Sequence, residues 1–351
     1  MAEAVTFVDQ TLEEALKNRR VGISGFLDIK EKILTMSQII FDLTLPSLEA
    51  VSCHGPATAE NIRACIQPCA DQVARAHELG CYHVKVSLGH KAVRKIPVSV
   101  AEALKQAQTR EKTVALHITR TCQYSKSDVL DLCRLVQEYG INSFVFDDRQ
   151  GELDSLDTYR RLLDLQQKIP CSLEYYGNND KGLATGNALA AIKSGVRRIA
   201  VSVGGIDGYP ATEEVLMSAR YLLKLPLHIP DNLAVCCEEI LGSIGQRVKP
   251  TKPIIGSHIF AHESGIHVDG VHKKSDLYEP FAPETVGLSR KIIIGKHSGK
   301  AAIELKLKEM NLSLPPEFIL KVLEKVRGLA IRQKAPVSNH QLQALVCEVT
   351  S

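Results

Sequence analysis

Short, almost continuously apolar runs alternate with amphipathic stretches through the first two thirds of the chain. Strands buried on both faces of a parallel sheet have such runs, and the amphipathic stretches have the spacing of helices with one apolar face. The pattern predicts strands at Val5–Asp9, Ile39–Leu43, Ala50–Cys53, Tyr82–Leu88, Thr113–Ile118, Ser143–Asp147, Cys171–Tyr175 and Arg198–Val203. Eight strand–helix units in about 225 residues predict an α/β fold, a (β/α)8 or TIM barrel. A doubly wound open sheet is the alternative, because periodicity does not show whether a sheet closes.

The chain changes character after Pro250. Before it, helical stretches such as "SDVLDLCRLVQEYG" and "GNALAAIKSG" end in glycine, which is favoured just after a helix. After it, proline and glycine punctuate short helical stretches, which predicts a loop-rich α+β C-terminal subdomain. Pro315 and Pro316 then begin a helical pattern, "FILKVLEKVRGLAIRQ", that predicts terminal helices. We therefore expect a barrel domain over residues 1–249 and a second domain over residues 250–351.

Charge and cysteine usage exclude several classes of protein. The 43 Lys and Arg residues face 40 Asp and Glu residues without a dense basic run, so nucleic acid is not expected as a partner. No run approaches the ~20 apolar residues of a membrane helix, and the N-terminus lacks the features of a signal peptide. The ten cysteines form no C-x-x-C pair, so free thiols in a reducing cytoplasm are expected. Cys65 and Cys69, four residues apart on a predicted helix, lack the further ligands of a metal site.

The stretch "LEYYGNND", residues 173–180, leads from the end of a predicted strand through a polar turn into a helix. Such strand ends are where α/β enzymes hold their chemistry. Its side chains, chiefly two tyrosines and two asparagines, form neither a metal cage nor an acid–base pair. The sequence therefore predicts the corner of an active site without the chemistry that belongs there.

Two uncommon motifs, "FAHESGIHVDGVHKKSDLYEPFAPETVG" and "GKHSGKAAI", span Phe260–Ile303. Together they resemble the C-terminal subdomain of homocitrate and isopropylmalate synthases, which are acetyl-CoA-dependent, Claisen-condensing TIM-barrel enzymes. The barrel half resembles this family more loosely, through "GELDSLDTY" and "GNALAAIKSG" after the sixth and seventh strands. The resemblance implies an acyltransferase that condenses acetyl-CoA with a 2-oxo acid.

The resembling family binds a divalent metal through an H-x-H pair at the seventh strand and an aspartate from the first. Two imidazoles and a carboxylate leave positions open for the oxygens of a 2-oxo acid. This chain has Tyr176 and Asn178 at the two histidine positions, and neither is a good ligand for a divalent metal at neutral pH. The first-strand motif reads "DQTLEEALK", which places Glu13 at the family's arginine and Glu14 at its metal-binding aspartate. Glu14 could still ligate, but it would do so alone.

Three further family positions differ at the ends of predicted strands. Arg149 in "DDRQG" replaces the threonine expected to hold the substrate carboxylate, and Tyr209 in "GGIDGYP" replaces an asparagine that supports the metal. Arg120 falls near the family's glutamate at the fifth strand. Because all the differences gather at strand ends, they predict a barrel that does not itself bind a catalytic metal.

The arm of the second domain keeps its family residues. His267 in S-G-I-H and Tyr278 in Y-E-P-F match the pair that assists acetyl-CoA enolisation, and a histidine near neutral pKa suits proton transfer. Lys296, His297 and Lys300 in "GKHSGK" could meet the phosphates of coenzyme A, or could form a solvated basic loop. His262 has either a role of this kind or a structural one.

In the resembling enzymes this subdomain reaches over the barrel of a neighbouring protomer. An intact arm on a barrel without a metal site therefore resembles the omega-type subunit of a two-subunit homocitrate synthase, which implies nitrogen fixation as its setting. The divalent metal and the H-x-H pair would belong to a partner subunit, and acetyl-CoA and 2-oxoglutarate would be the substrates. The alternatives are a regulatory or binding pseudoenzyme and a homomeric synthase rebuilt around His83, His90 and His117. An isopropylmalate synthase would need a further leucine-sensing domain.

Overall fold

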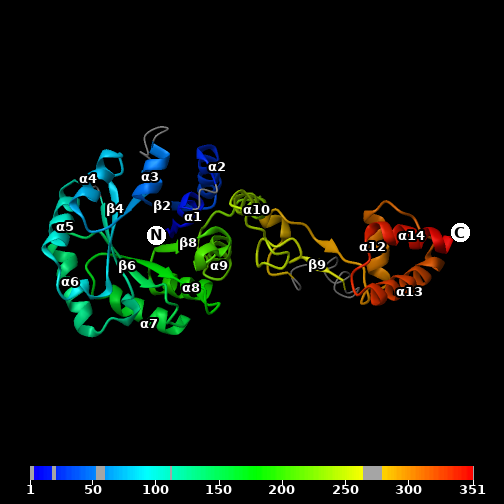
Figure 1. Cartoon of the computed structure of the whole chain (residues 1–351). Coiled ribbons are helices and arrows are strands. Elements are labelled where there is room, and N and C mark those ends of the chain that lie inside the picture. Colours follow the sequence, from blue (N-terminus) through cyan, green and yellow to red (C-terminus); the bar gives the residue numbers. More distant parts are fainter. Residues whose placement is uncertain (1–3, 18–20, 53–59, 111–112, 264–278, 351) are drawn as a thin grey trace. The chain divides into compact units, whose positions relative to one another are not determined.

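Eight parallel strands form a closed barrel in the computed structural model, which describes residues 4–17, 21–52, 60–110, 113–263 and 279–350 (Figure 1). The strands follow one another around the barrel in chain order, and β1 pairs with both β2 and β8. They are β1 Thr6–Asp9, β2 Gln38–Thr44, β3 Ile62–Ile66, β4 His83–Leu88, β5 Thr113–Ile118, β6 Ser143–Asp148, β7 Ser172–Gly177 and β8 Arg198–Val201. This pairing confirms the predicted TIM barrel and rules out the open sheet.

The third strand is where the sequence-based prediction was wrong. Of the predicted strand Ala50–Cys53, residues 50–52 end helix α3 (Leu45–Ser52) and Cys53 lies outside the described residues, while β3 comes later, at Ile62–Ile66. Arg63 interrupts the apolar run of β3, yet its side chain is buried inside the barrel. Cys65 accordingly lies on a strand and Cys69 precedes helix α4 (Ala70–Glu78), so the two do not share a helix.

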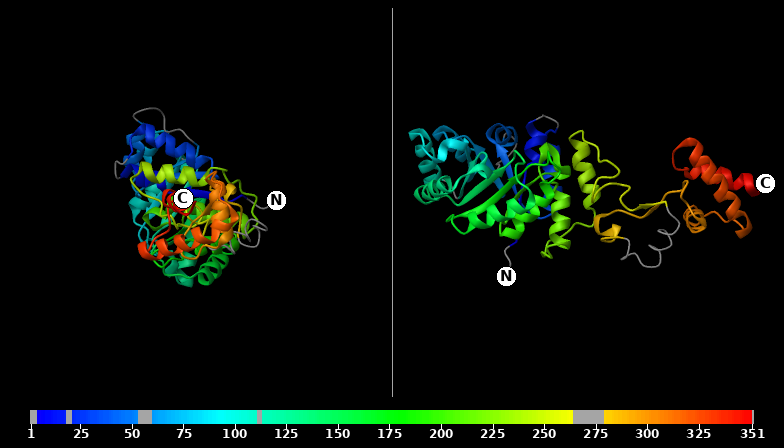
Figure 2. Two further views of the ribbon diagram at one scale, coloured as in Figure 1. Left: turned by 90° about the vertical axis from the view of Figure 1, so that its right-hand side faces the viewer. Right: turned by 90° about the horizontal axis from the view of Figure 1, so that it is seen from below.

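Helices surround the strands in Figure 1 and in the two further views of Figure 2. Besides α3 and α4 they are α1 Thr11–Lys17, α2 Ile23–Leu34, α5 Val98–Arg110, α6 Lys126–Glu138, α7 Ser155–Gln166, α8 Ala184–Ser194, α9 Thr212–Tyr221 and α10 Leu233–Ser243. The predicted glycine signal holds at α8, where Gly195 takes a φ of 110° that side chains rarely adopt. At α6, Ser125 and Asp128 cap the first turn through reciprocal hydrogen bonds.

Side chains alternate between the two faces of each strand, and this alternation positions the site. On β6, Val145 packs inside the barrel with Val8, Tyr176 and Ala200, and Asp147 faces the same way, toward His117. Phe144 and Phe146, which alternate with these two residues along the strand, face outward toward α6 and α7. The interior of the barrel is therefore lined by a mixture of apolar and charged side chains.

The chain forms two compact units, one of residues Met1–Pro230 and Cys236–Arg247 and the other of Asp231–Val235 and Val248–Ser351. In the second, β9 (Ala261–His262) pairs in parallel with β10 (Lys291–Ile292). The predicted terminal helices are present as α13 Pro316–Gln333 and α14 Asn339–Thr350. Helix α12 Lys300–Glu309, which precedes them, shares their apolar core around Val322 and Val326. Among the described residues, every helix is too short or too polar to cross a lipid bilayer.

Candidate functional site

Tyr176, at the carboxyl end of β7, points into the barrel, and its side chain is 1% exposed. Its hydroxyl donates a hydrogen bond to Oδ2 of Asp42 on β2. The same hydroxyl accepts from Nη2 of Arg63 on β3 and from Nζ of Lys85 on β4, each at 3.1 Å. The ring also lies 4.6 Å from the Lys85 ammonium. One of the two family histidine positions is therefore occupied by a phenol held in place from three other strands.

A buried ion-pair network continues from Tyr176 across the barrel. Arg63 lies between two carboxylates, with Nε 2.7 Å from Oδ1 of Asp42 and Nη1 2.7 Å from Oε1 of Glu174 on β7. Lys85 Nζ pairs with Asp42 at 2.5 Å. At the partly exposed rim of the network, Arg198 lies 3.3 Å from Glu174. Two buried carboxylates, two buried cations and Arg198 at the rim thus make up the network.

The network fixes the charge states of its members. Burial alone would raise the pKa of Asp42, but Arg63 and Lys85 outweigh it and hold that pKa well below its usual range. Burial lowers the pKa of Lys85, but the Asp42 carboxylate more than compensates and raises it well above its usual range. Burial and the charge of Asp42 raise the pKa of Tyr176, so its hydroxyl stays protonated. The ammonium beside Tyr176 is therefore permanent at neutral pH.

The residues at the family's metal positions do not fit a divalent metal. Tyr176 is a protonated donor, and Oδ1 of Asn178 already accepts the backbone N–H of Asp180 at 2.6 Å. Glu13 is buried and accepts from both the backbone and the hydroxyl of Thr44 at 2.9 Å, while Glu14 pairs with Lys17 at 2.9 Å. Over the described residues, no three His, Cys, Asp or Glu side chains gather in a group that could hold a metal ion.

Asp147, at the end of β6, organises the mouth of the barrel. Its Oδ1 accepts the backbone N–H groups of Arg120 and Arg149, at 3.3 and 3.2 Å. Its Oδ2 accepts from Nε2 of His117 at 2.7 Å and from Nε of Arg149 at 3.2 Å. Burial lowers the pKa of His117 despite the hydrogen bond to Asp147, which keeps the imidazole neutral at pH 7. One carboxylate thus orients both arginines and the histidine.

A polar cavity of about 470 Å³ opens at this mouth. Arg120 and Arg149 line it, together with Asn178 after β7 and Asp207 and Tyr209 after β8. Nη1 of Arg149 lies 3.5 Å from the Tyr209 hydroxyl. The structure therefore brings four positions where the chain departs from the resembling family, at residues 120, 149, 178 and 209, to one cavity.

The three histidines of the rebuilt-site alternative do not converge on one site. His83 begins β4, at the opposite end of that strand from the mouth, and bonds Thr113 at 2.7 Å. His90 bonds the backbone of Thr119, and only His117 reaches the Asp147 cluster. This geometry removes the support for a homomeric synthase rebuilt around them.

The residues predicted in the second unit have mixed outcomes. His267 and Tyr278 lie outside the described residues. Lys296 and His297 are exposed in the loop between β10 and α12, and the backbone N–H of His297 donates to Glu263 at 2.9 Å. Lys296 lines a cavity of about 430 Å³ with Lys334. Lys300 begins α12 and lies 3.6 Å from Glu304. Their role toward coenzyme A stays a prediction.

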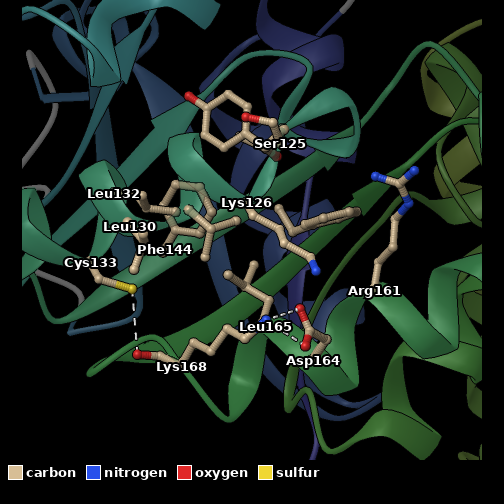
Figure 3. Close-up of a pocket in the computed structure, with 14 residues that line it drawn as sticks. Ser125, Lys126, Leu130, Leu132, Cys133, Phe144, Arg161, Asp164, Leu165 and Lys168 are labelled. Atoms are coloured by element: carbon tan, nitrogen blue, oxygen red, sulfur yellow. Dashed lines mark hydrogen bonds and ion pairs between the residues drawn. The ribbon is translucent and has the colours of Figure 1, made fainter.

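A further hollow, of about 520 Å³, lies on the outer face of the barrel between α6 and α7 (Figure 3). Phe144 and Leu165 form part of its apolar lining, and Lys126 and Arg161 stand at its edge. Because Phe144 and Asp147 face opposite sides of β6, this groove is separate from the mouth. The sequence analysis did not identify it, since it arises from the spacing of two helices.

Comparisons with known proteins agree on the two parts of the chain. The HMGL-like family matches residues 36–233, and the family described as homocitrate synthase post-HMGL domain-like matches residues 254–334. The chain is 32% identical to 2-isopropylmalate synthase 2 of Caldanaerobacter subterraneus subsp. tengcongensis over 84% of this chain and 77% of that one. It is 37% identical to homocitrate synthase 1 of Nostoc sp. over 63% of this chain and 59% of that one.

Among solved structures, an HMG-CoA lyase from Acenitobacter baumannii in complex with coenzyme A and 3-methylmalate superposes with a TM-score of 0.59. The identity is 18%, and the match covers 71% of this chain and 93% of that one. At this identity the likeness concerns the fold, and it agrees with the closed barrel.

Proposed function

The chain belongs to the HMGL-like family, with homocitrate and isopropylmalate synthases among its relatives, and on that premise we propose that it is the omega-type subunit of a two-subunit homocitrate synthase. The joint enzyme would condense acetyl-CoA with 2-oxoglutarate. A partner subunit with an intact H-x-H barrel would hold the divalent metal, which polarises the 2-oxo group when bound. Nitrogen fixation is the setting that this role implies.

The observation that carries the proposal is the Lys85 ammonium, 3.1 Å from the Tyr176 hydroxyl. A divalent cation about 4 Å from an ammonium group is repelled by about 8 kcal/mol at an effective dielectric constant of about 20. Tyr176 also offers a proton where a metal needs a lone pair. The barrel interior thus opposes a metal through both charge and ligand chemistry, which supports placing the metal in another subunit.

The second unit would supply what the partner's barrel lacks. We assign His267 as the group that moves a proton to or from the acetyl methyl group and Tyr278 as the group that orients the nucleophile. Lys296, His297 and Lys300 would bind the phosphates of coenzyme A, and the exposure of these three side chains supports that role. Ion pairing of this kind attracts a polyanion without fixing its position, so the catalytic geometry would rest on the first two residues.

A regulatory or binding pseudoenzyme is the second reading, and the polar cavity beside Arg120 and Arg149 favours it. The two readings differ in whether His267 takes part in turnover. Release of free coenzyme A from acetyl-CoA and 2-oxoglutarate would be measured for this chain, for an H-x-H subunit encoded beside it, and for the two together. We expect turnover only from the mixture. Turnover by this chain alone would overturn the proposal, and full activity of the H-x-H subunit alone would favour the pseudoenzyme.

A further inference from the structure

We propose that the mouth of the barrel is a metal-independent binding site for a small dicarboxylate, held by the guanidinium groups of Arg120 and Arg149. The ligand would act as an effector bound by charge, with no 2-oxo group required. The inference does not depend on a partner subunit, because all of its residues belong to this chain.

The two arginines are held at the same point. Their backbone N–H groups donate to one oxygen, Oδ1 of Asp147, at 3.3 and 3.2 Å, and both line the same cavity. Arg149 is fixed further, because its Nε donates to Oδ2 of Asp147 and its Nη1 lies 3.5 Å from the Tyr209 hydroxyl. These contacts use Nε and Nη1, while Nη2 donates to no residue in the part of the chain that the structure describes and is left for a carboxylate.

Arg120 has a strained backbone and an uncommitted side chain. Its φ is 57°, in the left-handed region that non-glycine residues seldom occupy, and the bond to Asp147 helps to hold it there. Its guanidinium makes no hydrogen bond or ion pair to any residue in the part of the chain that the structure describes. Strain retained at a cavity wall, with a charged side chain left over, is the pattern of a ligand-binding position.

The two carboxylates of the lining leave this positive charge largely uncompensated. Asp147 already accepts four hydrogen bonds, so its lone pairs are taken. Asp207 is largely exposed to solvent. The small part of it that is buried and the nearby charge of Glu14 raise the pKa of its carboxyl group. Beneath the mouth the barrel network adds three cations against two carboxylates. The remaining polar groups include the Asn178 amide and the Thr119 hydroxyl, which can donate to an anion.

The number of guanidinium groups and the room available favour a dicarboxylate over a single phosphate. The cavity of about 470 Å³ takes a molecule of several carbon atoms. Two arginines from consecutive strand ends suit an anion with two separate charged groups, one for each fork. A divalent metal, by contrast, would face the same cations that attract such an anion.

The test is isothermal titration of the full chain in EDTA with malonate, succinate and glutarate, and with acetate and inorganic phosphate as comparisons. We expect one site that binds a dicarboxylate at least tenfold more tightly than acetate or phosphate. Arg120→Ala and Arg149→Ala should each weaken binding at least tenfold, and Asp207→Asn should tighten it. Arg120→Ala is the cleaner variant, because the side chain that it removes supports no other residue.

The matched control is Arg134→Ala, an exposed arginine on α6 that pairs with Asp131. It removes the same charge far from the mouth and should leave the affinity unchanged. Absence of dicarboxylate binding to the wild-type chain would overturn the inference, as would binding that needs added Mn²⁺ or equal weakening by Arg134→Ala. Tighter binding of phosphate than of every dicarboxylate would overturn the assigned ligand class. None of these results bears on whether the chain completes a partner's active site.

Discussion

The Lys85 ammonium lies 3.1 Å from the Tyr176 hydroxyl inside the closed barrel, and both groups bond to the same oxygen of Asp42. The two residues come from strands β4 and β7, which β5 and β6 separate around the barrel. A fixed cation and a fixed phenolic proton thus stand where the related enzymes would place a histidine ligand. The poor fit of this position to a divalent metal is therefore a property of several interior residues and not of Tyr176 alone.

Restoring the histidines should therefore not restore a metal site. We expect the double variant Tyr176→His/Asn178→His to bind neither Mn²⁺ nor Zn²⁺ tightly, because the ammonium of Lys85 remains beside residue 176. Isothermal titration of the double variant and of the wild-type chain would check this. One tight site in the double variant would show that ligand identity alone decides metal binding.

Breaking the buried network should be costly. In Lys85→Met, Asp42 keeps Arg63 but loses one of its two cationic partners, and we expect a loss of about 3–5 kcal/mol in the free energy of unfolding. The control is Lys325→Met, which removes the exposed ion pair with Glu348 and should cost less than about 1 kcal/mol. Urea unfolding followed by circular dichroism measures both. Equal losses in the two variants would contradict the assigned importance of burial.

Asp9 should make the protein less stable as the pH rises from 4 to 7. Burial raises the pKa of this carboxyl to about 7, against 3.8 ordinarily. Between these values the unfolded chain releases the proton and the folded chain keeps it, so the free energy of unfolding falls with rising pH, by at most about 4 kcal/mol. Asp9→Asn should remove this slope. The stability of this variant relative to the wild-type protein should therefore be greater at pH 8 than at pH 4.5. Parallel stability–pH curves for the two proteins would count against it.

The arm residue His267 should matter only in the joint enzyme. His267→Ala should leave assembly with the H-x-H subunit intact and lower the rate about 10²–10⁴-fold, since a positioned proton-transfer group is lost. Asn178→Ala should change the rate little. Co-purification of each variant with the partner separates lost chemistry from lost binding. A complex that carries His267→Ala and works near the wild-type rate would reduce this chain to a scaffold.

The barrel could be predicted from the sequence because most of its strands are nearly unbroken apolar runs. The third was missed because Arg63 interrupts it, and that same arginine is central to the interior network. Asp42, Lys85 and Glu174 likewise sit within strands, at positions that face inward. A charged residue in each of four apolar strands was the available signal. The sequence alone could not show that these residues form one ion-pair network. Arg63 and Glu174 are 111 residues apart and pair only once the barrel has closed.

The differences at the mouth were identified from the resemblance, but their collective effect was not. The sequence indicated what residues 120 and 149 replace. It gave no sign that both would be anchored on Asp147 or that Arg120 would take a positive φ. Hydrogen bonds between consecutive strand ends depend on barrel register, which a single sequence does not specify.

The placement of charge in the interior also bears on how the molecule reaches its final shape. The first four strands contribute Asp42, Arg63 and Lys85, an excess of one positive charge, and Glu174 arrives only with β7. A half-barrel would bury an arginine with one of its two carboxylates missing, and a register slip would turn these charges outward. Assembly should therefore be all-or-none, with the two halves unable to persist separately. A chain cut between β4 and β5 should yield fragments that fold only when mixed, as circular dichroism would show.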